Sequence, residues 1–464
     1  MAAPAPEAPL PTPLEAATRS FLQAVERERQ GDRDAALALY RQALALHGAF
    51  PQAAANLAAL LAAAGKGAAA IAVLRRALAA APAAALLYCR LGELLRVAFR
   101  LEEAAELLAR ARALEPGDWE GWFYSGLLGL ERGEDGEAVL CFDRALALAP
   151  ADSPMRIAIR WHRAMAFLAR GDFATGFAEA EVRYALKPPP ARPFPMPLWQ
   201  GEALAGRRLL VWSDQGFGDT IQFARFLPLL EAEGARLVFA VQPELAPLMD
   251  GLSRHMTLMA PDDPLPQADF HVPLMSLPYR LGTTLATLPA AVPYLRPPPG
   301  RLALRLERAP ETRLAVGIVW AGHGSHPQDY KRSAPFEPFL ALCDIPGVAV
   351  VSLQSGPRGK DLAAAGAEAL VYDLGRHLGG FAESAAALLE LDLLVSVDTA
   401  MAHLAGALAR PAWVTLPYAA DWRWLRGRED SPWYPSLRLF RQDAPGDWDG
   451  LLARMRTAIL ERLA

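Results

Sequence analysis

An aspartate in the middle of the chain lies where it could take a proton from an attacking hydroxyl group. Residues 208–213 (RLLVWS) are predicted to form a strand, followed by a turn at residues 214–219 (DQGFGD) and then a helix. Open α/β sheets bind ligands at the carboxyl ends of their strands, which is where Asp219 falls. Asp219 could therefore act as a general base, or it could simply cap the helix that follows.

The glycines of the same turn indicate a close approach of the backbone to a ligand. Gly216 and Gly218 permit a tight turn, as in nucleotide-binding loops. Ile221, however, stands where the third glycine of a dinucleotide fingerprint belongs, so an NAD site is disfavoured.

A second loop of this kind follows a strand predicted at residues 393–397. Its sequence, SVDTAMAH (396–403), opens a helix with Thr399 as its cap. The free amides of the first helical turn and the helix dipole favour a diphosphate there. His403 lies on the same helical face as Thr399, where it could reach a leaving group or acceptor, or pack between helix and sheet.

A third loop, residues 321–333 (AGHGSHPQDYKRS), carries positive charge. Lys331 and Arg332 could stabilise a departing diphosphate, or they could be solvated surface charges. His323 and His326 have a spacing seen in metal sites, but the loop lacks a convincing ligand set, so no metal is expected. The two DxD triplets, at 32–34 and 447–449, fall at predicted helix starts and are interpreted as caps.

Aromatic residues are dense near the C-terminus. The segments 421–424 (DWRW) and 431–435 (SPWYP) suit stacking on a base or sugar ring, and equally a packed corner against the last helix, expected at 448–463.

The elements that would position these residues alternate between strands and helices. In the first series, strands are expected at 208–213, 236–241 and 257–259, with a helical stretch at 220–233. In the second, strands are expected at 314–320, 348–353, 369–372, 393–397 and 412–416. Such alternation predicts parallel sheets covered on both faces. Proline-rich links at 187–197 and 293–300 separate the regions.

The first third of the chain repeats with a period of 34 residues between about 17 and 152. Alanine recurs at 36, 70, 104 and 138 and again at 43, 77, 111 and 145, with a large residue at 40, 74, 108 and 142 between them. This spacing predicts tetratricopeptide-type helix pairs, with a degenerate fifth pair at 157–187 turning at Gly171. Such arrays bind proteins in their concave groove, or act as spacers or dimer surfaces.

Composition excludes several classes of partner. The 464 residues carry 47 Lys and Arg against 51 Asp and Glu, so no global positive field favours nucleic acid. The three cysteines are far apart in sequence, no stretch is apolar enough to span a bilayer, and the N-terminus lacks signal-peptide features. A cytoplasmic protein is expected.

These residues resemble bacterial tetratricopeptide-repeat proteins whose C-terminal region is similar to glycosyltransferase family 9, the ADP-heptose:lipopolysaccharide heptosyltransferases. The pieces that carry the resemblance are 214–223 (DQGFGDTIQF), 331–333 (KRS), 352–354 (SLQ), 396–404 (SVDTAMAHL) and 421–425 (DWRWL). The resemblance implies a GT-B fold of two Rossmann-like domains, inversion at the anomeric carbon, and no required metal or cofactor.

Carried over by position, the resemblance implies that Asp219 is the catalytic aspartate, with His403 as a second catalytic candidate. The nucleotide-sugar contacts expected are Gln215, Gly216, Gly218, Lys331, Arg332, Ser333, Gln354, Asp398, Thr399 and Ala400. Heptosyltransferases lack the repeat array, whereas the array here is similar to that of protein glycosyltransferases, including those that modify flagellin. The asparagine ladder of eukaryotic O-GlcNAc transferase is not present, since only Asn56 occupies its column.

The sequence thus predicts an α-solenoid followed by a GT-B region. The expected parts are a disordered lead-in (1–16), the array (17–187), a linker (188–200), an acceptor-side Rossmann-like domain (201–298) and a nucleotide-side domain (299–464). The expected activity is sugar transfer from a nucleotide sugar to Ser or Thr of a protein held by the array, with a flagellin-like protein as a candidate acceptor. A cell-envelope glycan transferase and a non-catalytic nucleotide-binding scaffold are the alternatives.

Overall fold

The computed structural model describes residues 12–186, 193–298, 308–324 and 329–464, so most of the lead-in, part of each proline-rich link and His326 lie outside the described residues. The chain forms two compact units, residues 1–163 and 164–464. None of the helices in the described ranges is long and apolar enough to cross a membrane.

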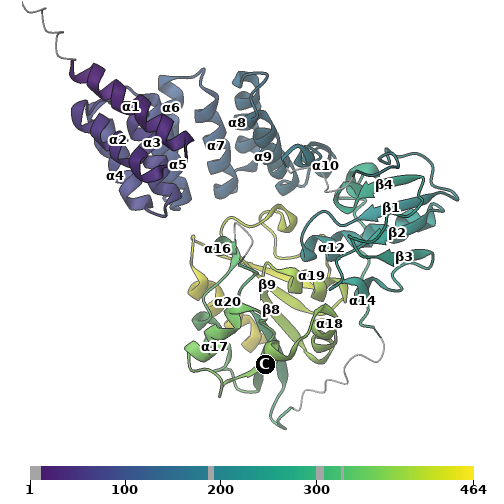
Figure 1. Cartoon of the computed structure of the whole chain (residues 1–464). Helices are drawn as coiled ribbons and strands as arrows, with labels where there is room; N and C mark the ends of the chain where they lie inside the picture. Colours follow the sequence, from purple (N-terminus) through teal and green to yellow (C-terminus); the bar gives the residue numbers. More distant parts are fainter. Residues whose placement is uncertain (1–11, 187–192, 299–307, 325–328) are drawn as a thin grey trace, which may run out of the picture. The chain divides into compact units, whose positions relative to one another are not determined.

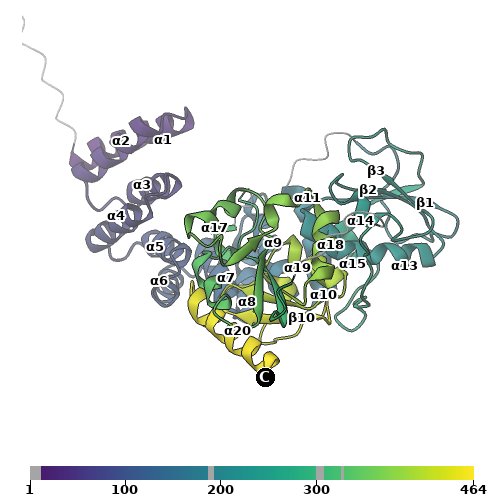
Figure 2. The same cartoon turned by 90° about the horizontal axis from the view of Figure 1, so that it is seen from below.

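The first unit contains antiparallel helix pairs that follow the predicted period (Figures 1 and 2). The pairs are α1 (Pro13–Arg29) with α2 (Arg33–Leu46), α3 (Pro51–Ala63) with α4 (Gly67–Ala80), α5 (Ala85–Val97) with α6 (Leu101–Leu114), and α7 (Trp119–Arg132) with α8 (Asp135–Leu148). The second helices begin at residues 33, 67, 101 and 135, a spacing of 34 throughout. The prediction of a tetratricopeptide-like solenoid is therefore confirmed.

Close helix packing explains the repeated columns. All eight alanines of the two columns are buried, and so are Tyr40, Leu74, Leu108 and Phe142 between them. A methyl group lets two helices approach closely, and the large side chain fills the space beside it. Asp32 and Asp447 accept hydrogen bonds from the amides of Ala35 and Gly450, which confirms that both DxD triplets act as helix caps.

The turn inside each pair requires a left-handed residue. Gly31, Gly65 and Gly133 adopt φ of +81°, +73° and +74°. Phe99 stands at the equivalent place in the third pair with φ +56°, a conformation that favours glycine.

The second unit begins inside the expected fifth helical pair. Its helices are α9 (Met155–Ala169), which starts in the first unit, α10 (Phe173–Ala180) and the short α11 (Arg183–Leu186). Phe173 and Phe177 are buried against Trp422, at ring-centre distances of 6.1 and 5.7 Å. These apolar contacts place the start of the unit ahead of the proline-dense segment 187–197, where the sequence suggests a boundary.

A four-stranded parallel sheet forms the first part of this unit. Its strands β1 (Arg208–Trp212), β2 (Arg236–Ala240), β3 (Met256–Met259) and β4 (Phe270–Pro273) lie in the order β3-β2-β1-β4. The helices that follow β1 are α12 (Phe217–Phe223) and α13 (Leu227–Ala232), joined by a 3-10 turn where one helix is predicted. Strand β4 was not predicted, because its sequence FHVP is short and ends in proline.

A six-stranded parallel sheet forms the second part, in the order β10-β9-β8-β5-β6-β7. The strands are β5 (Leu314–Val319), β6 (Val348–Ser352), β7 (Val371–Asp373), β8 (Leu393–Val397), β9 (Ala412–Leu416) and β10 (Leu437–Arg441). The helices include α16 (Asp329–Arg332), α17 (Lys360–Ala364), α18 (Phe381–Glu390), α19 (Ala400–Ala407) and α20 (Trp448–Leu463). The parallel α/β prediction is confirmed, with β10 as an additional edge strand.

Candidate functional site

The N-terminal ends of α12 and α19 meet, which brings two of the loops singled out in the sequence to one place. A Cβ atom at Gly218 would lie 3.1 Å from Cδ2 of His403 and 3.5 Å from Cα of Ala400. The absence of a side chain at Gly218 thus allows the contact. Asp219 from the end of β1 and residues 398–400 from the end of β8 belong to one site.

Asp219 is engaged through both carboxylate oxygens. Its Oδ2 accepts a hydrogen bond from the amide of Gly216 at 3.1 Å, so the residue caps α12. Its Oδ1 accepts one from Nη2 of Arg423 at 2.5 Å. About a quarter of the side chain, 26%, is exposed. The cap and the base role considered for this residue are compatible, because a carboxylate has about four acceptor positions.

Arg423 is the central residue that the sequence did not identify. Its guanidinium donates to Asp219, to Oδ1 of Asp421 at 2.8 Å and to Oε1 of Gln222 at 2.8 Å. It lies over the ring of Trp422, 4.4 Å from the centroid. The available signal was the arginine inside the aromatic motif at 421–424, and nothing in that motif indicates a partner 204 residues away.

Asp398 is buried at the end of β8 beside this arginine. Burial raises the pKa of its carboxyl group to about 6, and the negative charge of Asp421 acts in the same direction. Arg332 and Arg423 oppose that rise in the pKa. The carboxyl group of Asp398 therefore changes its charge near pH 6.

Thr399 caps α19 as predicted. Its Oγ1 accepts from the amide of Met401 at 3.3 Å and shares a hydrogen bond with Oγ of Ser396 at 3.1 Å. The cap leaves the N-terminus of an eight-residue helix, Ala400–Ala407, at the contact with Gly218. This is the helix end at which a diphosphate was expected.

His403 is packed inside the protein. Its Nδ1 is 3.0 Å from the hydroxyl of Tyr434, and its ring stacks on Trp424 at a centroid distance of 5.4 Å. Burial, together with the positive charges of Arg423 and Arg225, lowers the pKa of His403 well below its ordinary value, so the ring is neutral at pH 7. This placement agrees with the packing role that was the alternative to catalysis.

Hydrogen bonds among residues 329–333 stabilise the loop that follows β5. Asp329 accepts from Nε of Arg332 at 3.1 Å and from Oγ of Ser333 at 2.8 Å, and Ser333 in turn accepts from the amide of Gly322. Lys331 lies near the Tyr330 ring, with Nζ 6.0 Å from the centroid. Arg332 acts electrostatically on Asp398 and His403, which connects this loop to the site.

Gln354, at the end of β6, clamps the same loop through its side chain. Its Oε1 accepts from the amides of Trp320 and Ala321 at 3.1 and 2.9 Å, and its Nε2 donates to the carbonyl of Ala321 at 3.1 Å. These contacts occupy the amide group that the resemblance assigns to the nucleotide sugar.

The turn after β1, which contains Gln215 and Gly216, is also stabilised by a glutamine side chain. Nε2 of Gln242 donates to the carbonyl of Gln215 at 3.0 Å.

The aromatic segments near the C-terminus form a packed corner. Trp422, Trp424, Trp433 and Tyr434 are all buried. The fully buried Tyr434 and Trp433 surround the guanidinium of Arg225, which donates to the carbonyl of Trp433 at 2.7 Å. The corner packs against Phe173 and Phe177 of α10 and Phe223 of α12, whereas the last helix, α20, belongs to a different apolar cluster. The burial fits the packing role, but with other partners than the last helix that was expected.

A second ion cluster lies at the carboxyl ends of β1 and β4. Nε of Arg183, from α11, donates to Oδ2 of Asp214 at 3.2 Å, and Nη2 donates to Oγ of Ser276 at 2.9 Å. The amide of Met275 donates to the other oxygen of Asp214 at 3.2 Å. The side chains of Arg183 and Asp214 are both buried, with exposed fractions of 5% and 4%. The loop bearing Asp219 is thus held by one arginine at each end.

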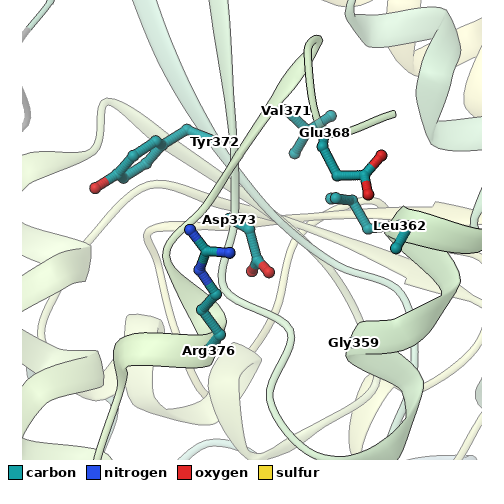
Figure 3. Close-up of a pocket in the computed structure, with 8 residues that line it drawn as sticks. Gly359, Leu362, Glu368, Val371, Tyr372, Asp373 and Arg376 are labelled. Atoms are coloured by element: carbon teal, nitrogen blue, oxygen red, sulfur yellow. The ribbon is translucent and has the colours of Figure 1, made fainter. Parts of the chain in front are cut away.

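A small hollow of about 200 Å³ lies elsewhere, at the edge strand β7 (Figure 3). Its lining includes Glu368, Tyr372, Asp373 and Arg376. It contains none of the sequence-predicted site residues and is smaller than ordinary ligand pockets, which measure about 300–1,000 Å³. Within the described ranges, no cluster of three or more His, Cys, Asp or Glu side chains is arranged to hold a metal ion.

No family model matches the chain. Protein FlbA of Caulobacter vibrioides is 29% identical over 437 residues, which covers 80% of this chain and 72% of that protein. The match is therefore longer than either compact unit alone.

Similar solved structures cover the repeat region. A tetratricopeptide-repeat protein of Thermus thermophilus, TTC0263, is 25% identical, with a TM-score of 0.32, over 37% of this chain and 98% of that chain. PilF of Pseudomonas aeruginosa is 20% identical, with a TM-score of 0.33, over 38% of this chain and 78% of that chain.

Proposed function

We propose that the protein is an inverting glycosyltransferase that moves a sugar from a nucleotide sugar to a Ser or Thr hydroxyl of another protein. In this proposal the two sheets are the halves of a GT-B enzyme, the four-stranded sheet on the acceptor side and the six-stranded sheet on the nucleotide side. The reaction takes place in the cytoplasm and uses no metal or further cofactor.

The observation that carries the proposal is the meeting of α12 and α19 at Gly218. It sets a partly exposed carboxylate, Asp219, beside the capped helix end at Thr399 and Ala400. A general base and an anion-binding helix end are the two parts that transfer from a sugar diphosphate needs. They come from separate sheets, as expected of an enzyme that joins two substrates.

In the proposed reaction the acceptor oxygen attacks the anomeric carbon from the side opposite the diphosphate. The bond from that carbon to the phosphate oxygen breaks, and the nucleoside diphosphate leaves with the electron pair. Asp219 takes the proton of the attacking hydroxyl. The positive end of the α19 helix dipole, with Arg332 and Arg423 nearby, stabilises the charge on the leaving group.

The repeat array supplies the acceptor in this proposal. Its column at residues 22, 56, 90 and 124 is polar in three of four repeats. Arg90 donates to the hydroxyl of Tyr124 at 2.6 Å and pairs with Glu120, while Asn56 donates to Tyr40. The column is thus polar but hydrogen-bonded within the array, so the support for acceptor binding is the repeat architecture itself rather than this column.

The test is to incubate the purified chain with nucleotide sugars and a cell extract, and to search for glycosylated Ser and Thr by mass spectrometry. A thermal-shift comparison of UDP, GDP, ADP, CMP and dTDP first selects the nucleotide, because a ligand that binds the folded state raises the melting temperature. Modified peptides support the proposal. Labelled sugar found only in glycolipid would indicate a cell-envelope glycan transferase instead.

One observation favours a non-catalytic scaffold as the second candidate. Both oxygens of Asp219 are already engaged, by Gly216 and Arg423. A scaffold would bind a nucleotide with no transfer of sugar and no slow hydrolysis of the donor, and this outcome separates it from the enzyme.

A further inference from the structure

Arg423 connects the two halves of the proposed site. Its Nη2 donates to Asp219 at 2.5 Å. Its Nη1 donates at 2.8 Å to Asp421, which caps the 3-10 turn that contains Arg423. Its Nε donates to Gln222 on α12 at 2.8 Å. These contacts use three of the five N–H groups of a guanidinium, which leaves room for a further acceptor.

The surroundings of Arg423 indicate where that acceptor lies. Trp424, the residue after Arg423, stacks on the ring of His403 in α19 at a centroid distance of 5.4 Å, so Arg423 lies close to that helix. Arg332 and Arg423 also act electrostatically on the buried Asp398 directly before the cap of α19. An arginine fork binds carboxylate and phosphate with similar geometry, so one can replace the other.

A second observation comes from Gln222. This side chain is fully buried, and its Oε1 is held by Arg423. Its Nε2 has no hydrogen-bond partner within the described part of the chain. A buried amide without an acceptor is costly, and a ligand oxygen beside the guanidinium would satisfy it.

We propose that Arg423 is shared between Asp219 and the diphosphate of the donor. Without donor, the guanidinium holds Oδ1 of Asp219. When the diphosphate binds at the start of α19, it takes over the guanidinium and leaves Oδ1 free to accept the proton of the acceptor hydroxyl. The base thus becomes available only when a donor is in place. This inference rests on the proposed function and adds a residue that couples donor binding to the base.

If Arg423 exchanges between Asp219 and the diphosphate, substitutions of Arg423 and Asp219 should have opposite effects on the affinity for a nucleoside diphosphate. Arg423→Gln removes a charge-assisted contact, so it weakens binding of a nucleoside diphosphate about tenfold or more. Asp219→Asn removes the competitor for the guanidinium, so it tightens binding by about threefold to tenfold. In the double variant the affinity equals that of Arg423→Gln alone, because the benefit of Asp219→Asn acts through the arginine.

The experiment is calorimetric titration of the full chain and its variants with the nucleoside diphosphate chosen by thermal shift, and with inorganic pyrophosphate. Arg428→Gln is the matched control, since Arg428 lies in the same loop, pairs with Asp430, and leaves the affinity unchanged. Thermal unfolding of each variant checks the fold. If Arg423→Gln does not fold, Arg423→Lys keeps the charge without the fork and still weakens binding.

The possible results separate the two claims. If Asp219→Asn tightens binding equally in the Arg423→Gln background, the effect is simple charge repulsion and the exchange is wrong. If Arg423→Gln binds the nucleoside diphosphate as tightly as the parent chain, the exchange is also wrong. In both cases the parent chain still binds the nucleoside diphosphate, so the proposed function is not overturned. If the parent chain binds neither nucleoside diphosphates nor pyrophosphate, the proposed function fails together with the exchange.

Discussion

The two units of the chain are stabilised in different ways. In the repeat unit, small and large apolar side chains recur every 34 residues and contact neighbours in sequence. In the α/β unit, the loop at 214–219 is held by two arginines from distant segments, Arg183 at one end and Arg423 at the other. Structure is therefore encoded locally and redundantly in the first unit. In the second, a large apolar core supports the sheets, and the loop at 214–219 is held in addition by long-range ion pairs.

The largest effect is expected from removing helices that were assigned to the array but pack in the α/β unit. A chain beginning at residue 155 keeps α9, α10 and α11 and should unfold cooperatively. A chain beginning at residue 187 loses the buried Phe173 and Phe177, each worth about 3–5 kcal/mol, and should be insoluble. Expression and circular dichroism test this. Equal solubility of both chains would show that the pair belongs to the array.

A single substitution at the buried arginine is expected to be nearly as severe. Arg183→Met removes the guanidinium from Asp214 and Glu181 and should lower the free energy of unfolding by about 3–5 kcal/mol, because buried carboxylates lose their cation. Arg75→Met in the array is the control, since its pair with Glu103 is largely exposed and contributes about 0–1 kcal/mol. Urea unfolding of the two variants measures the difference. Similar losses would contradict the contrast between the units.

The pH dependence of stability should depend on Asp398. Its pKa of about 6 in the folded chain exceeds the value of about 3.9 for an unfolded aspartate, so the folded state binds more protons between pH 4 and 6. Stability from this group is present below pH 4 and is lost as the pH rises through 6. Asp398→Asn should therefore be more stable than the parent by about 3 kcal/mol at pH 7.5 and nearly equal to it near pH 4.

Urea unfolding of parent and variant at both pH values tests this expectation. The pKa of His403 is lowered in the folded chain, so the contribution of His403 to stability is lost as the pH falls. Both proteins contain His403, so this contribution cancels in the difference between their free energies of unfolding. A constant difference between the two proteins across the pH range would show that Asp398 does not titrate there.

Features determined by local sequence could be predicted, whereas features that depend on long-range contacts could not. The helix pairs were predictable because Ala36 and its equivalents repeat at one spacing, and the strands because their apolar runs are bounded by turns. The turn at 214–219 and the cap at Thr399 were predictable because local residue types determine them. Arg423 was missed because its role depends on a partner 204 residues away, and a single sequence carries no signal for such a pair.

The smallest effect is expected in the array, at the position that breaks the glycine column. Phe99→Gly relieves a left-handed conformation that costs about 1 kcal/mol for a residue with a side chain, so the variant should be stabilised by at most that amount. Gly65→Ala, at the same place in the preceding pair, should be destabilised by about 1 kcal/mol. Thermal unfolding measures both. A loss of stability in Phe99→Gly would mean that contacts of the phenyl ring outweigh the backbone strain.

The central claim is that Asp219 acts as the base beside a phosphate-binding helix end. The most direct measurement is the single-turnover rate of sugar transfer in the parent chain and in Asp219→Asn, with the affinity for the nucleoside diphosphate determined on the same samples. We predict that the rate falls by about 100-fold to 10,000-fold while the diphosphate remains bound. An Asp219→Asn variant that transfers sugar at the parent rate would contradict the account.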